Sequence, residues 1–357
     1  KQPTLTFESA KGIGENEIYG MRTFKVTLKV DSNPENLLVF HLYNNSKQSG
    51  YALATSFYHV KEIACGKKST ITYYDAKNNQ HVINYDLNGS KSVVEKLMGE
   101  KIDCNDDISI SLNVSDPFEH KWCDRFSGNV KSIRKVLGVN NSFYQCKYDL
   151  NGNMVSYSNH DGSSQEFVFN NENRLISQTD IWKGSLGFGH PDKNYFTYDK
   201  YGNELSRLRF YSHDGKKVKF QKFLTEYKKT NTGYEKITYQ SWDWEPLKKQ
   251  KPVMFNSDGK LASANITRSK SKYGNEYIIN KNGKTNEKEM VFSSNNQLIR
   301  FKEVSSGIMS VYHETKYSGH IYDTQGNWTR RVLNTNNNAT GKMVARKNVE
   351  SRIITYY

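Results

Sequence analysis

A short turn motif recurs through the last two thirds of the sequence and constrains the fold more than any other feature. Its clearest copy is Tyr322-Asp323-Thr324-Gln325-Gly326-Asn327-Trp328. The pattern is an aromatic residue, then Asp, Asn or Ser, two free positions, Gly or Asn, one free position and an apolar residue. Further copies begin at Tyr148, Phe169, Tyr198, Tyr211, Phe255 and Phe292. After Tyr198 and Tyr211 the apolar residue comes one place later.

The spacing of this motif predicts a β-hairpin. Asp, Asn or Ser at the first turn position accepts a backbone N–H, and Gly three residues later supplies a positive φ. Asn replaces Gly most readily because it tolerates the left-handed region. The flanking runs are rich in Tyr, Phe, Thr, Val and Ile, which favour strands. Weaker copies, at Tyr85 to Lys91 and at Ile279 to Thr285, keep the turn but lose one flanking end. Recurrence of one hairpin unit indicates a repeat sheet.

The motif resembles the YD repeat of the Rhs/YD-repeat proteins, which centres on Tyr-Asp-x-x-Gly. The Tyr-Asp pair stands at Tyr148, Tyr198 and Tyr322, with an outlying pair at Tyr85. The resemblance covers roughly residues 143–357 and does not reach most of 1–115. It implies long antiparallel sheets that serve as shells or surface scaffolds, some of which bind carbohydrates or proteins. The irregular spacing of the copies favours an open curved meander, without the family's shell-and-toxin role.

The first part of the chain predicts a different β-rich domain. Residues 24–30 alternate with apolar side chains at even numbers, which is typical of a half-buried strand. We expect the other elements to be strands at 37–43, 51–60 and 108–114, a hairpin of 71–74 with 81–85, and a short helix at 92–98. The expected organisation is all-β: a β-sandwich-like domain over 1–115, a junction over 116–147, and a YD-repeat-like antiparallel meander or curled sheet over 148–357. Residues 346–357 would form its last strand.

The chain contains four cysteines, Cys65, Cys104, Cys123 and Cys146. Their even number, with spacings unlike any zinc motif, is compatible with two disulfides and an oxidising compartment. Pairing of neighbours would give Cys65–Cys104 and Cys123–Cys146, one of three possible connectivities. The alternative is four free thiols in a cytosolic protein.

The net charge of +14 indicates an anionic partner or surface. The charge is scattered over lysines, and no helix-turn-helix, zinc-finger or ribonucleoprotein-type motif is present, which argues against nucleic acid. No apolar run approaches the roughly 20 residues of a transmembrane helix. The composition therefore favours a protein or an anionic polysaccharide as partner.

The most unusual tetrad is Trp242-Asp243-Trp244-Glu245. Flat aromatic rings beside carboxylates are typical of sugar sites, where the rings stack on the sugar and the carboxylates accept its hydroxyls. A plain strand would equally explain the alternation, with both Trp residues buried and both acids in solvent. Asp243 and Glu245 would then share a face and could form a carboxylate pair.

The most basic part of the chain spans residues 216–251. Lys217 and Lys219 alternate with apolar residues, which predicts a strand with one cationic face, and Lys248 and Lys249 follow in a second run. Such a face could dock an anionic polymer or an acidic partner. Lysines also keep sheet edges soluble and unpaired, which explains the same pattern without a ligand.

No catalytic or metal-binding motif is apparent. The His-Asp pairs at His160 and His213 lie in expected Asp-Gly turns, and no His-x-His, His-Glu-x-x-His or Cys-x-x-Cys pattern occurs. We therefore expect no cofactor and no enzyme activity. The favoured function is a non-catalytic binding or scaffold protein of the bacterial periplasm, outer membrane or exterior, recognising another protein, possibly as an immunity- or adhesion-type partner. The alternatives are a polysaccharide-binding protein and a carbohydrate-active enzyme.

Overall fold

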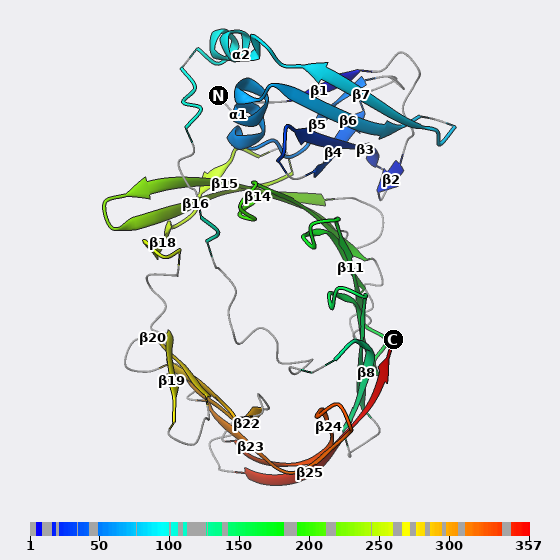
Figure 1. The fold of residues 1–357 in the computed structure, drawn as a ribbon, viewed down its shortest axis with the longest axis vertical. Helices are drawn as coiled ribbons and strands as arrows, with labels where there is room; N and C mark the ends of the chain where they lie inside the picture. Colours follow the sequence, from blue (N-terminus) through cyan, green and yellow to red (C-terminus); the bar gives the residue numbers. More distant parts are fainter. Residues whose placement is uncertain are drawn as a thin grey trace. The chain divides into compact units, whose positions relative to one another are not determined.

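The computed structural model has an all-β fold, with 64% of residues in strands and 7% in helices, as expected (Figure 1). All strand pairs in it are antiparallel where the register is described. The structure describes residues 5–8, 16–18, 21–33, 35–42, 49–75, 77–99, 101–105, 110–112, 126, 128–137, 142–181, 191–211, 219–243, 245–259, 266–271, 276–282, 286–294, 298–305, 311–337 and 344–357.

The N-terminal part forms a seven-stranded sheet in the order β1-β5-β4-β3-β6-β7, with β2 paired to β3. Two short helices, α1 and α2, accompany it (Figure 1). The bounds are β1 Thr6–Glu8, β2 Asn16–Ile18, β3 Met21–Val30, β4 Asn36–Leu42, β5 Ser49–Ala52, α1 Phe57–Cys65, β6 Lys68–Tyr74, β7 Gln80–Asp86 and α2 Ser90–Met98.

The rest of the chain forms an antiparallel meander in which successive strands are neighbours. The bounds are β8 Val130–Leu137, β9 Phe143–Tyr148, β10 Met154–Asn159, β11 Ser164–Phe169, β12 Leu175–Ile181, β13 Asp192–Tyr198, β14 Glu204–Tyr211, β15 Lys219–Thr230, β16 Gly233–Trp242, β17 Lys248–Lys249, β18 Val253–Asn256, β19 Ile266–Lys270, β20 Glu276–Asn282, β21 Asn286–Phe292, β22 Leu298–Ser305, β23 Val311–Tyr322, β24 Trp328–Asn337 and β25 Val344–Tyr356.

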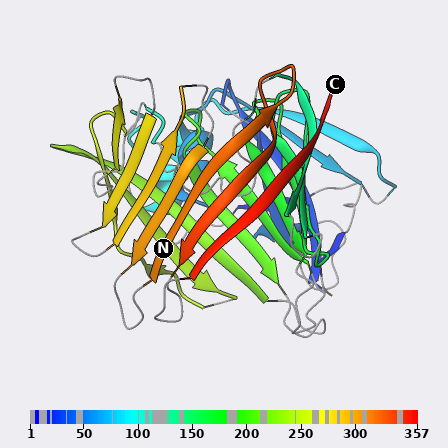
Figure 2. The same cartoon turned by 90° about the horizontal axis from the view of Figure 1, so that it is seen from below.

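The chain divides into two compact units that do not follow its linear order. Unit 1 comprises residues 1–113 and 165–261, and unit 2 comprises residues 114–164 and 262–357. Unit 1 therefore joins the N-terminal sheet to β11–β18, and unit 2 joins β8–β10 to β19–β25. In unit 2 the last strand, β25, pairs with β8, which extends the meander on that side (Figure 2).

The N-terminal sheet has a core on each of its faces. The expected alternation in β3 is confirmed, because Phe24 and Val26 are buried in a cluster with Phe40. On the opposite face, Leu37 and Val39 of β4 pack against apolar side chains of β13–β15. A β-sandwich was expected within residues 1–115. The second layer that packs on this sheet is instead supplied by strands β13–β15 of the meander. Full burial of one such side chain contributes roughly 1.5–3 kcal/mol.

Helix α1 corrects one prediction, because residues 51–60 were expected to be a single strand. β5 ends at Ala52, and a helix begins after Ser56. The Ser56 N–H donates to Nδ1 of His59 at 3.2 Å, a bond for which helices usually use Glu or Gln at this position. Burial lowers the pKa of His59 to about 4, so the ring stays neutral near pH 7 and can accept. The expected short helix nearby is confirmed as α2.

Two further expectations about strands were wrong. Residues 110–112, expected within a strand at 108–114, follow an irregular path across unit 1. Their backbone is held by Asn203, whose Oδ1 accepts the Leu112 N–H and whose Nδ2 donates to the Ile110 carbonyl. The weak turn copy at Ile279 is also misplaced, because Asn280 is still paired inside β20.

The hairpin motif folds as predicted in the copies at Tyr148, Phe169, Tyr198 and Tyr322, whereas the weak copy at Tyr85 leads from β7 into helix α2 and closes no hairpin. In the copy at Tyr148, the Asp149 N–H donates to the Asn153 carbonyl, and Gly152 has a φ of 82°. The same arrangement closes the hairpins that begin at Tyr198 and Tyr322. A further copy, Tyr74-Asp75, closes β6 and β7 with Asn78 at a φ of 63°. The motif is hard to recognise in the sequence there, because Gln80 takes the place of the final apolar residue.

The expected Cys65–Cys104 disulfide is confirmed, with Cα atoms 5.5 Å apart. It fastens the end of α1 to the segment that follows α2. Cys146 is also disulfide-bonded, while Cys123 lies outside the described residues.

Unit 2 buries a charged cluster on β24, β25 and β8. Glu350, fully buried, accepts from Arg331 Nε at 2.6 Å and lies 2.5 Å from Lys135 Nζ. The Arg331 and Arg352 guanidinium groups lie 3.9 and 3.6 Å from the Trp328 ring centroid. Trp328 is the apolar position of the clearest repeat copy, so the repeat places a ring between two buried cations.

Candidate functional site

The tetrad Trp242–Glu245 does not continue as a strand, which corrects the expected alternation. β16 ends at Trp242, and Asp243 takes a left-handed φ of 47°. Asp243 Oδ1 accepts the Phe220 N–H at 2.8 Å, so this carboxylate fixes the start of β15. Glu245 lies 3.7 Å from Lys248 Nζ. Trp244 lies outside the described residues.

The structure brings three of the expected binding residues to one face of the unit 1 sheet. Lys219 shares a strand face with Gln221, which is paired with Trp242. Lys248 is paired with Gln240, two residues before Trp242 in β16. Lys249 is paired with Tyr239 and therefore belongs to the opposite face. Lys217 lies outside the described residues.

Trp242 ends a row of planar polar side chains that crosses five neighbouring strands. The register pairs Gln178 of β12 with Asn194, Asn194 with Arg209, Arg209 with Gln221, and Gln221 with Trp242. Strands lie about 4.8 Å apart, so the row spans roughly 19 Å. We call these five residues the Trp242 row. It lies on the face opposite to Leu208 and Phe210, which pack on the N-terminal sheet.

Trp242 is both exposed and held in place. Its side chain is 41% exposed, and its ring meets the Tyr211 ring edge-on at 5.8 Å. The Arg209 guanidinium lies 5.5 Å from the same Tyr211 ring and donates to Asp192 at 2.5 Å. Burial raises the pKa of Tyr211, and Asp243 nearby adds to the effect, so the phenol remains a donor. An indole held this way can present a flat apolar face to a ligand.

The other end of the row is built from amides around Asp180. This buried carboxylate accepts from Gln165 at 2.8 Å, from Gln178 at 2.7 Å and from Asn194 at 3.3 Å. The amides of Gln178 and Asn194 are thereby fixed in orientation. Gln221 is only 4% exposed, and its amide atoms are not among the buried side-chain atoms that lack a partner.

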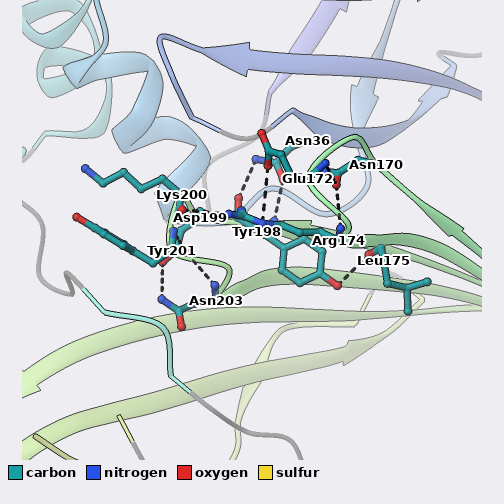
Figure 3. A network of polar contacts seen from close by, with 10 residues as sticks. All are labelled: Asn36, Asn170, Glu172, Arg174, Leu175, Tyr198, Asp199, Lys200, Tyr201 and Asn203. Carbon is teal, nitrogen blue, oxygen red and sulfur yellow. Dashed lines mark hydrogen bonds and ion pairs between the residues drawn. The ribbon is translucent and has the colours of Figure 1, made fainter. Parts of the chain in front are cut away.

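A second polar network surrounds the repeat copy at Tyr198 (Figure 3). Asn36 of β4 accepts the Tyr198 N–H and donates to its carbonyl, at 2.7 and 3.0 Å. Arg174 donates to the carbonyls of Asp199 and Lys200. These bonds consume the polar groups of the turn and join it to its neighbours, so we assign this network a structural role.

A small cleft of about 270 Å³ lies beside that turn. Polar side chains dominate its walls, including Asp31, Lys61, Glu62 and Lys200. Asp31 accepts the backbone N–H groups of Lys67 and Lys68, and Lys61 donates to the Asn105 carbonyl at 2.7 Å. The cleft therefore contains side chains that already serve the fold.

Within the described ranges, no three His, Cys, Asp or Glu side chains gather closely enough to hold a metal ion. No helix in those ranges is long and apolar enough to cross a membrane.

Most of the Trp242 row was not predicted from the sequence, although the sequence contains a signal for part of it. In the sequence, Phe210 follows Arg209, and Gln221 follows Phe220. Such alternation of polar and apolar residues is typical of a half-buried strand. The missing information was the register, because the polar residues join into a row only when five strands are aligned. The motif's sixth position was also taken as free, yet Asn153 and Asn203 each donate through Nδ2 to the turn Asp.

Comparisons with known proteins give no family for this chain. No family model matches, and no curated protein matches. Among solved structures, a porin-like protein from Bacteroides uniformis has a TM-score of 0.31 at 10% identity, covering 64% of this chain and 98% of that one. A structure described as TcdB2-TccC3-TEV has a TM-score of 0.22 at 10% identity, covering 93% of this chain and 22% of that one.

Proposed function

We propose that this chain is a non-catalytic binding protein that recognises a macromolecule through the sheet face bearing Trp242. The observation that carries the proposal is the exposed indole of Trp242, held against Tyr211 at the end of the Trp242 row. Large exposed aromatic side chains fixed among polar groups are typical of recognition surfaces. Lys219 and Lys248 on the same face supply positive charge beside it.

The state of the two acids weighs against the enzyme alternative. Asp243 is committed to the Phe220 N–H, and Glu245 lies beside Lys248. A glycosidase pair needs two carboxylates facing one bond, with one of them held protonated by its surroundings. Asp243 lies in a left-handed turn and Glu245 lies beyond the end of β16, so the two acids do not share the strand face on which the carboxylate pair was expected.

The partner is a protein or a polysaccharide, and the location we propose is the bacterial periplasm, outer membrane or exterior. The Cys65–Cys104 disulfide supports such a location, because disulfides persist in oxidising compartments. A protein partner would use Trp242 as a buried anchor, whereas a polysaccharide would lie across the strands of the row.

The test is affinity capture from the source organism with the purified chain as bait, at low and at moderate salt. Trp242→Ala is the paired bait, and Tyr85→Ala, which removes an exposed aromatic ring of the N-terminal sheet, is the matched control. We expect a macromolecule to be captured by wild type and by Tyr85→Ala but lost with Trp242→Ala. Capture that is equal with all three baits, or absent from all, would contradict the proposal.

A further inference from the structure

We infer that Arg207 and Lys236 form a binding site for an oxyanion, a phosphate or carboxylate group, on the sheet face that bears Trp242. Three neighbouring strands contribute to the site: β14 supplies Arg207, β15 supplies Thr225 and β16 supplies Lys236. The site goes beyond the proposed function, because it would hold an anion whichever macromolecule binds at Trp242.

The register places the three side chains on one face of the sheet. Arg207 is paired with Phe223, and Lys236 is paired with Tyr227. These two partners lie on either side of Thr225 along β15. Residues that are paired across strands, or that are two apart along a strand, point to the same side of a sheet. The two cations therefore flank Thr225 from the neighbouring strands β14 and β16.

Two polar atoms of these side chains are buried without a hydrogen-bond partner. They are Nε of Arg207 and the hydroxyl oxygen of Thr225, a residue that is only 1% exposed. Buried polar groups in folded proteins nearly always have a partner. The Nε–H group can only donate a hydrogen bond, and the hydroxyl group can donate one as well. A ligand oxygen that enters between the two cations would supply the acceptor that both groups lack.

The positive charge of these side chains is also left unbalanced. Arg209, two residues further along β14 on the same face, is paired with Asp192 at 2.5 Å. Arg207 and Lys236 make no such ion pair in the part of the chain that the structure describes. Burial lowers the pKa of Lys236, Glu204 opposes this shift, and Arg207 adds to it, so the two cations lie near enough to repel each other. An oxyanion would balance the charge that Glu204 alone does not.

The guanidinium group of Arg207 is oriented for a ligand with two oxygens. Its central carbon lies 4.2 Å from the centroid of the Phe223 ring. Stacking on a ring fixes the plane of a guanidinium group without using its N–H donors. Such a planar fork can donate two parallel hydrogen bonds to a phosphate or carboxylate group. The ammonium group of Lys236 would add a third donor.

Isothermal titration calorimetry of the full chain with inorganic phosphate and with malonate tests the site. Low ionic strength is used, because salt screens contacts between charges. We expect saturable binding of at least one of the two probes. Arg207→Gln and Lys236→Gln should each weaken it about tenfold, because each removes charge-assisted hydrogen bonds. Tighter binding of phosphate would identify a phosphate group as the preferred ligand group, and tighter binding of malonate would identify a carboxylate.

Two further variants separate this site from general effects of charge and folding. Lys249→Gln removes an exposed lysine from the opposite face and should bind as wild type does. Thr225→Val keeps the shape of a side chain whose hydroxyl has no partner in the fold, so it should leave the stability of the unliganded chain unchanged and weaken binding about threefold.

Binding of neither probe, or binding that survives Arg207→Gln or Lys236→Gln, would overturn the inference. If the oxyanion site fails in this way while Trp242-dependent capture of a macromolecule persists, the proposed function stands.

Discussion

The turns at Tyr148 and at Tyr198 have the same local structure in different surroundings. In both, Oδ1 of the turn Asp accepts two backbone N–H groups and Oδ2 accepts the Asn side chain four residues on. The first turn lies at the surface of unit 2. The second is buried in unit 1, where Asn36, Arg174 and the backbone of residues 110–112 surround it.

The same hydrogen bonds lead to opposite pKa shifts. Burial opposes ionisation of both carboxyl groups, but at Asp149 the bonds from Asn153 and Asn151 outweigh it and lower the pKa. At Asp199 the desolvation is much stronger and raises the pKa despite the bonds from Asn203 and Tyr201. The motif therefore determines the geometry of the turn, while the contribution of the turn Asp to stability depends on the residues that pack around it.

Removing the buried turn carboxylate should produce the largest loss of stability. Asp199→Ala leaves the N–H groups of Tyr201 and Asn203 without an acceptor in a buried site, and we expect a loss of roughly 3 kcal/mol. Urea unfolding measures the change. Asp199→Asn is the matched control, because Asn170 supports the same turn with Oδ1 elsewhere in the chain. Equal losses for Ala and Asn would show that the charge matters more than the acceptor.

The exposed turn should be less sensitive to the same change. Asp149→Ala also removes the acceptor for two N–H groups, but water can replace it, as at a helix N-cap. We expect a loss of about 1 kcal/mol by urea unfolding. A loss as large as that of Asp199→Ala would break the proposed link between burial and energetic cost.

The two carboxylates should also give opposite pH dependences. The lowered pKa of Asp149 means that its stabilisation is present above the unfolded pKa of about 3.9 and is lost as the pH falls. The raised pKa of Asp199 means that its contribution is present below about 3.9 and is lost as the pH rises through the folded value. Urea titrations from pH 3 to pH 7, comparing wild type with Asp149→Asn and Asp199→Asn, should therefore show difference curves of opposite slope. Parallel curves would contradict the assigned directions.

The smallest effect is expected from the side chain that closes the exposed turn. Asn153→Ala removes one hydrogen bond to Asp149 Oδ2 and should cost about 0.5–1 kcal/mol. Asn203→Ala is the equivalent variant in the buried turn. It should cost more stability, because the Asn203 side chain also forms hydrogen bonds with the backbone of Ile110 and Leu112. Thermal unfolding of the pair should show a clearly larger drop for Asn203→Ala. A similar drop for both would mean that residues 110–112 gain little from Asn203.

Much of the fold was predictable because its determinants are local. A turn needs Asp or Asn, then Gly or Asn, at fixed spacing, and these residues place the hairpins at Tyr148, Tyr198 and Tyr322 correctly. Helix α1 was missed because His59 performs a capping role that usually belongs to Glu or Gln. The path of residues 110–112 was missed because a distant side chain, Asn203, replaces the partner strand that alternation had suggested.

The candidate site was less predictable, because it depends on register. Trp242, Lys219 and Lys248 were identified by residue type, and the structure places them on one face. Asp243 and Glu245 were expected to share a strand face, but the left-handed turn at Asp243 ends the strand between them. Gln178, Asn194 and Gln221 are ordinary polar residues in the sequence. They become neighbours only through the alignment of β12–β16, which no local pattern specifies.

The pairing of β25 with β8 has a consequence for the order in which unit 2 can assemble during synthesis. The hydroxyl groups of Ser132 and Thr355 meet across a sequence separation of 223 residues. A ribosome adds about 5–20 residues per second, so β8 waits some tens of seconds for its neighbour. Until β25 arrives, β8 has an open edge and Lys135 lacks Glu350. Unit 1 has no such dependence on β25, so a nascent chain can complete it while unit 2 still needs protection from aggregation.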